Sequence, residues 1–199
     1  SSAASDVYKR QLAEQRPDLA QGRVVAAHLG NGASLCALQH GRSIDTTMGM
    51  SALDGLPMGS RSGALDAGAV TYMMRRFGFD ADALDRMLYE ESGLKGLSGL
   101  TNDVATLVAS EDPQAAFALD YFTYHVAQYV GAMAVAMGGI DALVFTGGIG
   151  ENAPGLRIAI RDRLGFLGSV ESLVIPANEE RMMAIHACAL LEARTEAAA

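Results

Sequence analysis

The sequence predicts an α/β protein in which a mixed sheet is flanked by helices. Short strand-like runs at 24–28, 34–38 and 42–46 come first, and the glycine-containing turns between them are typical of antiparallel hairpins. Helix-like segments follow, and from residue 141 onward the chain alternates strand, helix, strand and helix. Hairpins followed by strand–helix units indicate antiparallel and parallel strand pairs within one sheet.

Capping signals mark the starts of the predicted helices. Asp66 and Asp80 are each expected to cap a helix, and Asp112-Pro113 predicts the start of a long one, because proline is favoured at the first helical position. The predicted elements after the third strand are helices at 66–77 and 80–91, a loop at 92–99, helices at 103–109 and 113–138, a strand at 141–146, a helix at 154–164, a strand at 172–176 and a helix at 178–193.

The first 22 residues are polar and show no clear period, so we interpret them as an N-terminal leader, and we assign no role in the fold to its opening residues 1–11. Within it, residues 1–11 are a candidate for a non-native remnant of cloning or sequencing. The nucleotide-binding domain argued for below is predicted to occupy residues 23–199.

Composition limits the classes of partner. Half of the 199 residues are hydrophobic and 22 are glycine, which is typical of a compact α/β protein. A formal net charge of −8 argues against a nucleic-acid partner, because such a surface needs clustered lysines and arginines. Two distant cysteines without a CxxC pair, and no visible signal peptide, favour a cytoplasmic protein.

Residues 121–140 contain no Asp, Glu, Lys or Arg, which raises the question of a membrane span. The segment nevertheless carries His125, Gln128, three tyrosines and three glycines, and a predicted strand begins directly after it. That strand leaves no room for a membrane exit. We therefore predict a buried core helix and no membrane partner.

Two glycine-rich turns follow predicted strands, HLGNGAS at 28–34 and TGGIGEN at 146–152. Glycine permits positive φ and lets a phosphate or purine approach the backbone N–H groups closely. Each turn has another interpretation, because Asn31-Gly32 is a strong hairpin signal and Gly148–Ala153 also fits the G-x-G-x-x-A fingerprint of dinucleotide folds. Together, the two turns predict a nucleotide site.

Two charged residues are candidates for chemistry on a phosphate. Arg61 lies in a long loop, 47–63, within Gly-Ser-Arg-Ser-Gly, where a planar cation could bridge phosphoryl oxygens; the alternative is a solvated surface arginine. Glu179 follows Asn178, and these residues alone favour a helix cap over a Mg²⁺ ligand. The absence of HExxH, GxSxG and Walker A motifs argues against zinc proteases, serine hydrolases and P-loop enzymes.

Five motifs, taken in order, resemble the acetate kinase family, within the superfamily of acetate and sugar kinases, Hsp70 and actin. They are HLGNGAS at 28–34, DTTMGMSALDGLPMGSRSG at 45–63, SGLKGLSGLTND at 92–103, DALVFTGGIGEN at 141–152 and IPANEE at 175–180. The resemblance implies an actin-like ATPase (ribonuclease H-like) domain. It covers only the C-terminal half of the family's length, so the family's N-terminal domain is expected to be absent.

The resemblance also implies roles for individual residues. Arg61 would stabilise the transition state, and Glu179 would bind Mg²⁺ rather than serve only as a cap. The residues implied to form the ATP site are His28, Leu29, Gly30, Asn31, Gly32, Asp103, Val104, Ala105, Gly148, Ile149, Gly150, Glu151 and Asn152.

The implied activity is that of an ATP-dependent phosphotransferase with a carboxyl group as acceptor. ATP and acetate would give ADP and acetyl phosphate, with Mg²⁺ as cofactor. Acetate needs no deprotonation at neutral pH, so no strong general base is required. The full-length protein is expected to be a homodimer, and the fragment alone to be inactive.

Two departures from the family pattern affect these expectations. Ala105 stands where the family usually has Arg or a similar residue, so one nucleotide contact is expected to be missing. The segment 165–174 is shorter than in the family, which leaves the packing of the last strand open. Three alternatives remain: a butyrate or propionate kinase, a non-catalytic nucleotide-binding fragment or pseudokinase, and a dinucleotide-dependent oxidoreductase, which requires several parallel βα units after its fingerprint.

Overall fold

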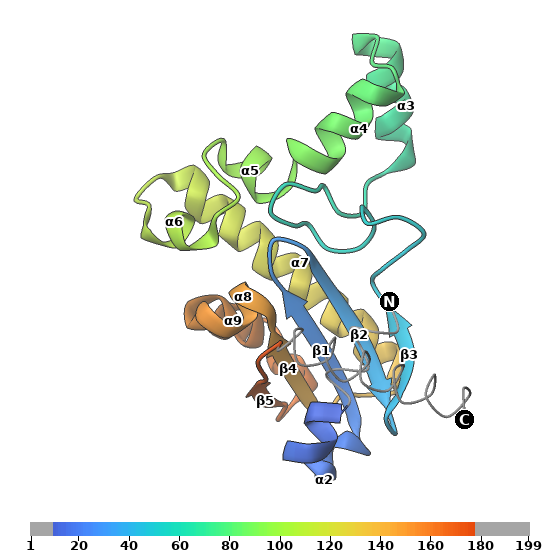
Figure 1. The fold of residues 1–199 in the computed structure, drawn as a ribbon, viewed down its shortest axis with the longest axis vertical. Coiled ribbons are helices and arrows are strands. Elements are labelled where there is room, and N and C mark those ends of the chain that lie inside the picture. The colour runs from blue at the N-terminus through green and yellow to red at the C-terminus, as the bar shows by residue number, and fades with distance from the viewer. Residues whose placement is uncertain (1–9, 178–199) are drawn as a thin grey trace, which may run out of the picture.

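The structure, a computed structural model, describes residues 10–177 and contains one five-stranded mixed sheet in the order β3-β2-β1-β4-β5 (Figure 1). β1 (Arg23–Leu29), β2 (Ala33–Gln39) and β3 (Arg42–Thr46) form antiparallel pairs. β4 (Ala142–Thr146) pairs parallel with β1, and β5 (Glu171–Val174) pairs parallel with β4. The predicted mixed sheet is confirmed. Despite the shortened segment before it, β5 joins the sheet edge.

The central strands are buried on both faces, because successive side chains of a strand point to opposite sides. One set of residues joins the larger core cluster together with the long helix: Val25, Ala27, Leu29, Leu143 and Phe145. The intervening set forms a second cluster on the other face: Val24, Ala26, Ala142 and Val144. The strands that lead into the two glycine turns therefore lie between the two core clusters.

The long helix α7 (Pro113–Met137) packs against the sheet (Figure 1). Asp112 caps it by accepting a hydrogen bond from Gln114 N at 2.8 Å, and Gly138 ends it in the left-handed conformation. Phe122 and Val126 are completely buried, which confirms the predicted core helix. Over residues 10–177, no helix combines the length and the apolar character needed to cross a membrane.

Four more predicted helices are present: α3 (Ala67–Phe77), α4 (Ala81–Glu90), α6 (Val104–Ala109) and α9 (Pro154–Asp162). Asp66 caps α3 and Asp80 caps α4 through their side chains, as predicted. α3 and α4 project from the rest of the molecule as an arm (Figure 1). The predicted helix at 178–193 lies outside the described residues.

Two segments predicted as loops are helical: α5 (Gly93–Ser98) and α8 (Gly147–Asn152). Glycine is among the poorest helix formers, so local propensity indicated loops. Tertiary contacts override it in α5, where Leu94 is fully buried and its N–H donates to Met58 O at 2.9 Å. A 3-10 turn (Gly165–Leu167) then connects α9 to β5.

The described part of the predicted leader, residues 10–22, takes part in the fold. The expectation of no fold role is wrong for Gln11, which is helical and buried. Residues 10–15 are helical, and α2 (Pro17–Ala20) follows. Leu12 is 3% exposed and joins the second core cluster, and Arg16 Nη2 donates to Glu171 Oε2 of β5 at 3.0 Å. No clear hydrophobic period marks this segment in the sequence, because only a few of its residues pack against the core. The domain boundary at residue 23 and the origin of residues 1–11 stay predictions.

An ion pair fastens the start of β1 to the chain before β4, and it gives a testable pH dependence. Arg23 Nη2 lies 2.6 Å from Asp141 Oδ1, and Arg23 N donates to Asp141 Oδ2 at 2.7 Å. The hydrogen bonds from Arg23 lower the pKa of the Asp141 carboxyl below its ordinary value of 3.8. A carboxyl group whose pKa is lower in the folded than in the unfolded protein stabilises the fold at pH values above its unfolded-state pKa. This contribution to stability is lost as the pH falls through the folded-state pKa.

We therefore expect Asp141→Asn to lower the urea midpoint at pH 7, and the difference from wild type to shrink as the pH falls below about 3.8. Urea unfolding at several pH values measures it. A difference that stays constant down to acid pH would contradict the assignment of this dependence to Asp141.

Candidate functional site

A cavity of about 820 Å³ lies where four segments meet, within the size range of small-molecule sites. The segments are the β1–β2 hairpin, the chain from 102 to 108, α8, and the start of α9. The lining residues are Gly30, Asn31, Asn102, Asp103, Val104, Ala105, Val108, Gly148, Ile149, Asn152, Ala153, Pro154, Gly155 and Leu156. The two predicted glycine turns therefore face one cavity, although more than a hundred residues separate them in the chain.

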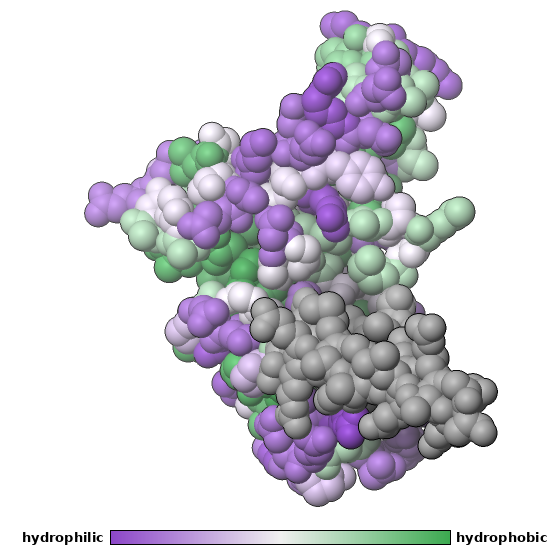
Figure 2. All heavy atoms as spheres, in the orientation of Figure 1, coloured by the Kyte–Doolittle hydropathy of each residue, from purple (hydrophilic) through white to green (hydrophobic). Residues whose placement is uncertain are grey.

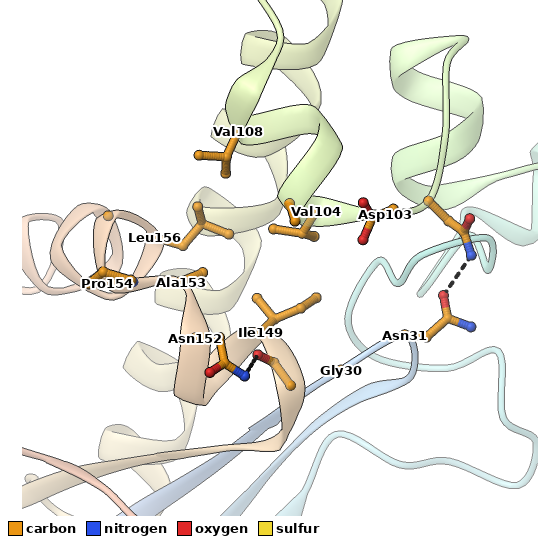
Figure 3. Close-up of a pocket in the computed structure, with 14 residues that line it drawn as sticks. Gly30, Asn31, Asp103, Val104, Val108, Ile149, Asn152, Ala153, Pro154 and Leu156 are labelled. Atoms are coloured by element: carbon orange, nitrogen blue, oxygen red, sulfur yellow. Dashed lines mark hydrogen bonds between the residues drawn. The ribbon is translucent and has the colours of Figure 1, made fainter.

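The cavity has an apolar side and a polar side. Figure 3 shows Val108, Leu156, Ala153 and Pro154 on the left, and Asn31 and Asp103 on the right. Asn102 also lines the cavity. An apolar side that accepts a flat ring, next to amide groups and bare backbone, suits a nucleotide with its base on one side and its phosphates on the other.

Gly148 faces the cavity, and a Cβ built on it would meet no atom within 4 Å. A side chain here would therefore take space from a ligand rather than from the protein. Gly147 is different: its φ is +79°, and a Cβ would lie 2.8 Å from Leu29 O. One glycine of this turn is required for the fold, and the next keeps the cavity open.

Asn31 connects the hairpin to two other loops. Its Oδ1 accepts a hydrogen bond from Asn102 Nδ2 at 2.9 Å, and its carbonyl accepts from Gly59 N at 2.9 Å (Figure 3 shows the first). A Cβ on Gly59 would lie 2.0 Å from Asn31 Oδ1. The close approach allowed by Gly59 thus links the cavity to the loop that carries Arg61.

The backbone around Arg61 is pinned against the start of α5. Lys95 N donates to Gly59 O at 2.9 Å, and Ser92 N donates to Ser60 O at 2.9 Å. Gly93 has a φ of +59°, and a Cβ on it would lie 2.2 Å from Met58 O. The loop 47–63 therefore holds the arginine in a defined place.

The Arg61 side chain is half-buried and does not line the cavity. Its Nη1 lies 3.8 Å from Met58 Sδ and 3.8 Å from the position that a Cβ on Gly32 would occupy. Within residues 10–177, no carboxylate lies within salt-bridge distance of it. Its charge is thus available beside the hairpin.

Asp103 has a structural task as well as a place at the cavity. Its Oδ2 caps α6 by accepting a hydrogen bond from Thr106 N at 2.9 Å and another from the Thr106 hydroxyl. These bonds lower the pKa of the Asp103 carboxyl, so it is ionised at neutral pH. Ala105 lines the cavity with only a methyl group.

Five residues implied for the ATP site do not line the cavity: His28, Leu29, Gly32, Gly150 and Glu151. Leu29 and Gly150 are buried behind it, and Glu151 hydrogen-bonds to backbone N–H groups. The His28 ring lies between the hairpin and α8, since its Cε1 is 3.2 Å from the Cβ position of Gly147.

Several lining residues were missed from the sequence: Asn102, Val108, Ala153, Pro154, Gly155 and Leu156. Val108 is four residues from Val104 on α6, a spacing that places side chains on one helix face. Ala153 to Leu156 directly follow the glycine turn and could have been included on that ground.

The predicted Mg²⁺ site cannot be located within residues 10–177, which are the residues that the structure describes. Within residues 10–177, no group of three or more His, Cys, Asp or Glu side chains could hold a metal ion. Glu179, the predicted Mg²⁺ ligand, lies beyond the described residues, two positions after Ala177.

The fold is that of an actin-like ATPase domain. The solved ROK hexokinase of Thermus thermophilus shares this fold at a TM-score of 0.50 and 16% identity, over 86% of this chain and 57% of that one. The chain belongs to the acetokinase family, whose family model matches residues 5–183. This membership and the mixed sheet contradict the dinucleotide-dependent oxidoreductase alternative.

Related sequences and solved structures are consistent with membership of this family. Acetate kinase of Nitrobacter hamburgensis is 46% identical over 92% of this chain and 50% of its own length, and that of Rhodopseudomonas palustris strain TIE-1 is 44% identical over 88% and 51%. The solved acetate kinase of Porphyromonas gingivalis superposes with a TM-score of 0.88, at 31% identity over 94% of this chain and 54% of that one. A propionate kinase of Francisella tularensis gives 0.83, at 37% identity over 92% and 53%. The chain thus spans about half the length of these proteins.

Proposed function

We propose that this chain is the C-terminal, nucleotide-binding half of an acetate kinase. The observation that carries the proposal is the meeting of the hairpin, α6 and α8 around one cavity, with Arg61 beside the hairpin. Membership of the acetokinase family supports ATP as the nucleotide and a small carboxylate as the acceptor.

In this proposal the base of ATP occupies the apolar side, against Val108 and Leu156. The phosphates extend past Gly148 toward Gly30 and Asn31, where the Asn31 side-chain amide can donate to them. The geometry favours this direction because Arg61 Nη1 lies on the hairpin side.

The reaction would be in-line transfer of the γ-phosphoryl group to acetate. Such transfer depends on positioning and on neutralising charge on the equatorial oxygens, which Arg61 would supply from its pinned loop. Mg²⁺, held by Glu179 and the phosphates, would add further charge neutralisation. Because acetate is already ionised at neutral pH, a site of backbone N–H groups, an arginine and a carboxylate needs no general base.

Propionate or butyrate is the alternative acceptor, and the structural similarity to a solved propionate kinase supports this alternative. The other alternative, a non-catalytic fragment or pseudokinase, is supported by the half-length of the chain. We propose further that the full-length protein is cytoplasmic, binds neither nucleic acid nor membrane, and is a homodimer. The arm supports the homodimer, because Tyr72, Met74 and Phe77 of α3 are exposed and Figure 2 shows hydrophobic atoms among the hydrophilic ones on the arm. Sedimentation of the full-length protein tests it.

Trapping of acyl phosphates by hydroxylamine tests the activity directly. A protein restored with its N-terminal half should turn over acetate with Mg-ATP and prefer it to propionate and butyrate. The 199-residue chain should be inactive or nearly so, since one wall of the cleft is missing. A preference for propionate or butyrate would show that one of these acids, and not acetate, is the substrate. If the restored protein forms no acyl phosphate, the pseudokinase alternative is supported instead.

A further inference from the structure

α8 is a helix that its own sequence does not favour. Three of its six residues are glycine, a poor helix former. In so short a helix, few hydrogen bonds offset the unfavourable free energy of nucleation. Yet α8 supplies Gly148, Ile149 and Asn152 to the cavity. Its conformation must therefore be stabilised by side-chain contacts rather than by backbone propensity.

Two side chains hold α8 at its opposite ends. Glu151 Oε1 accepts hydrogen bonds from Gly147 N at 3.0 Å and from Ala177 N at 2.9 Å. Arg157 Nη1 donates to Gly150 O and Glu151 O, each at 2.8 Å. An acceptor at the N-terminal amide and a donor at the C-terminal carbonyls satisfy backbone groups that a helix leaves open.

The Glu151 bond pair has a further consequence for the layout of the site. Ala177 belongs to the chain that leaves β5, and Ile175 N of the same segment donates to Phe145 O of β4 at 2.9 Å. One carboxylate oxygen thus ties the first residue of the glycine turn to a segment fixed on the sheet. Glu151 itself does not line the cavity.

We propose that Glu151 is a positioning residue: its Oε1 holds α8 against the strand exit at Ala177 and so presets the nucleotide-facing groups of Gly148 and Asn152. This inference rests on the proposed nucleotide binding. It assigns to Glu151 an acceptor role toward two N–H groups rather than contact with a ligand, and it needs the oxygen rather than the negative charge.

Glutamine and alanine separate these roles. Glu151→Gln keeps an Oε1 that can accept both hydrogen bonds, whereas Glu151→Ala removes it. Amide hydrogen exchange followed by NMR on the 199-residue chain should show Gly147 and Ala177 exchanging faster in Glu151→Ala and nearly as in wild type in Glu151→Gln. Glu90→Ala, at an exposed carboxylate on α4, is the matched control.

Calorimetric titration with ADP, without Mg²⁺, then tests positioning. We expect binding to weaken about tenfold in Glu151→Ala, and no more than about twofold in Glu151→Gln and Glu90→Ala. Far-ultraviolet circular dichroism should stay unchanged in all three variants.

The outcomes separate the two claims. Unchanged exchange at both amides in Glu151→Ala would overturn the tether, whatever the titration gives. Faster exchange with unchanged ADP affinity would overturn the positioning role, and equal weakening in Glu151→Gln and Glu151→Ala would indicate that charge matters instead. If the wild-type chain binds no ADP, the proposed nucleotide function fails, and the exchange data still decide the tether.

Discussion

Arg61→Ala in a protein restored with its N-terminal half should lower kcat by about a hundredfold or more, the scale of losing one preorganised charge donor. The backbone of this arginine is pinned to α5, and its guanidinium has no carboxylate partner within residues 10–177. In the proposed function, this charge would act on the transferring phosphoryl group. Nucleotide affinity should change much less than kcat, because the interaction is made mainly in the transition state.

Arg61→Lys should recover only part of the loss, since a point charge cannot reproduce the planar fork of a guanidinium. Arg86→Ala, at an exposed arginine on α4, should leave kcat unchanged and is the matched control. The assay is trapping of acetyl phosphate by hydroxylamine. Near-normal turnover in Arg61→Ala would contradict the proposed catalytic role of Arg61.

Gly93→Ala should destabilise the fold by roughly 3 kcal/mol, combining left-handed strain with overpacking. The new Cβ would lie 2.2 Å from Met58 O and 2.7 Å from Arg61 O, both backbone atoms that cannot move aside cheaply. In the restored protein, kcat should also fall, because the displaced segment carries Arg61.

Gly99→Ala is the matched control for Gly93→Ala. Gly99 has a similar φ, +67°, but a Cβ there would meet nothing within 4 Å. Its cost should therefore be only the strain of the left-handed conformation, about 1 kcal/mol. Urea unfolding of the 199-residue chain measures both variants. Equal losses would show that the contact with the arginine loop is not tight.

The sheet was predictable because strand patterns and turns are local signals. The hairpins at Asn31-Gly32 and His40-Gly41 fixed two antiparallel pairs. α5 and α8 were not predictable, because glycine argues for loops and only distant partners, such as Met58 and Ala177, make these segments helical. The packing of residues 10–22 depends on contacts with β5 that no local pattern reveals.

The site was predictable in outline and less so in detail. The glycine turns and positions 103–105 do meet at the cavity, as the motifs implied. The resemblance places Glu151 in the ATP site with its neighbours, but successive residues of a helix point in different directions, and the Glu151 carboxylate accepts hydrogen bonds from Gly147 N and Ala177 N instead. The roles of the lining residues in nucleotide binding stay predictions.

The most direct test of nucleotide binding is a calorimetric titration of the 199-residue chain with Mg-ADP at millimolar concentrations. We expect weak binding, because this chain spans about half the length of its relatives and would form only part of the proposed cleft. Gly148→Val should abolish the heat, since its side chain would fill cavity space and meet no protein atom within 4 Å at Cβ. Gly165→Val, at a glycine that is equally open but outside the cavity, should bind like wild type. Identical traces for wild type and Gly148→Val would contradict the assignment of this cavity to a nucleotide.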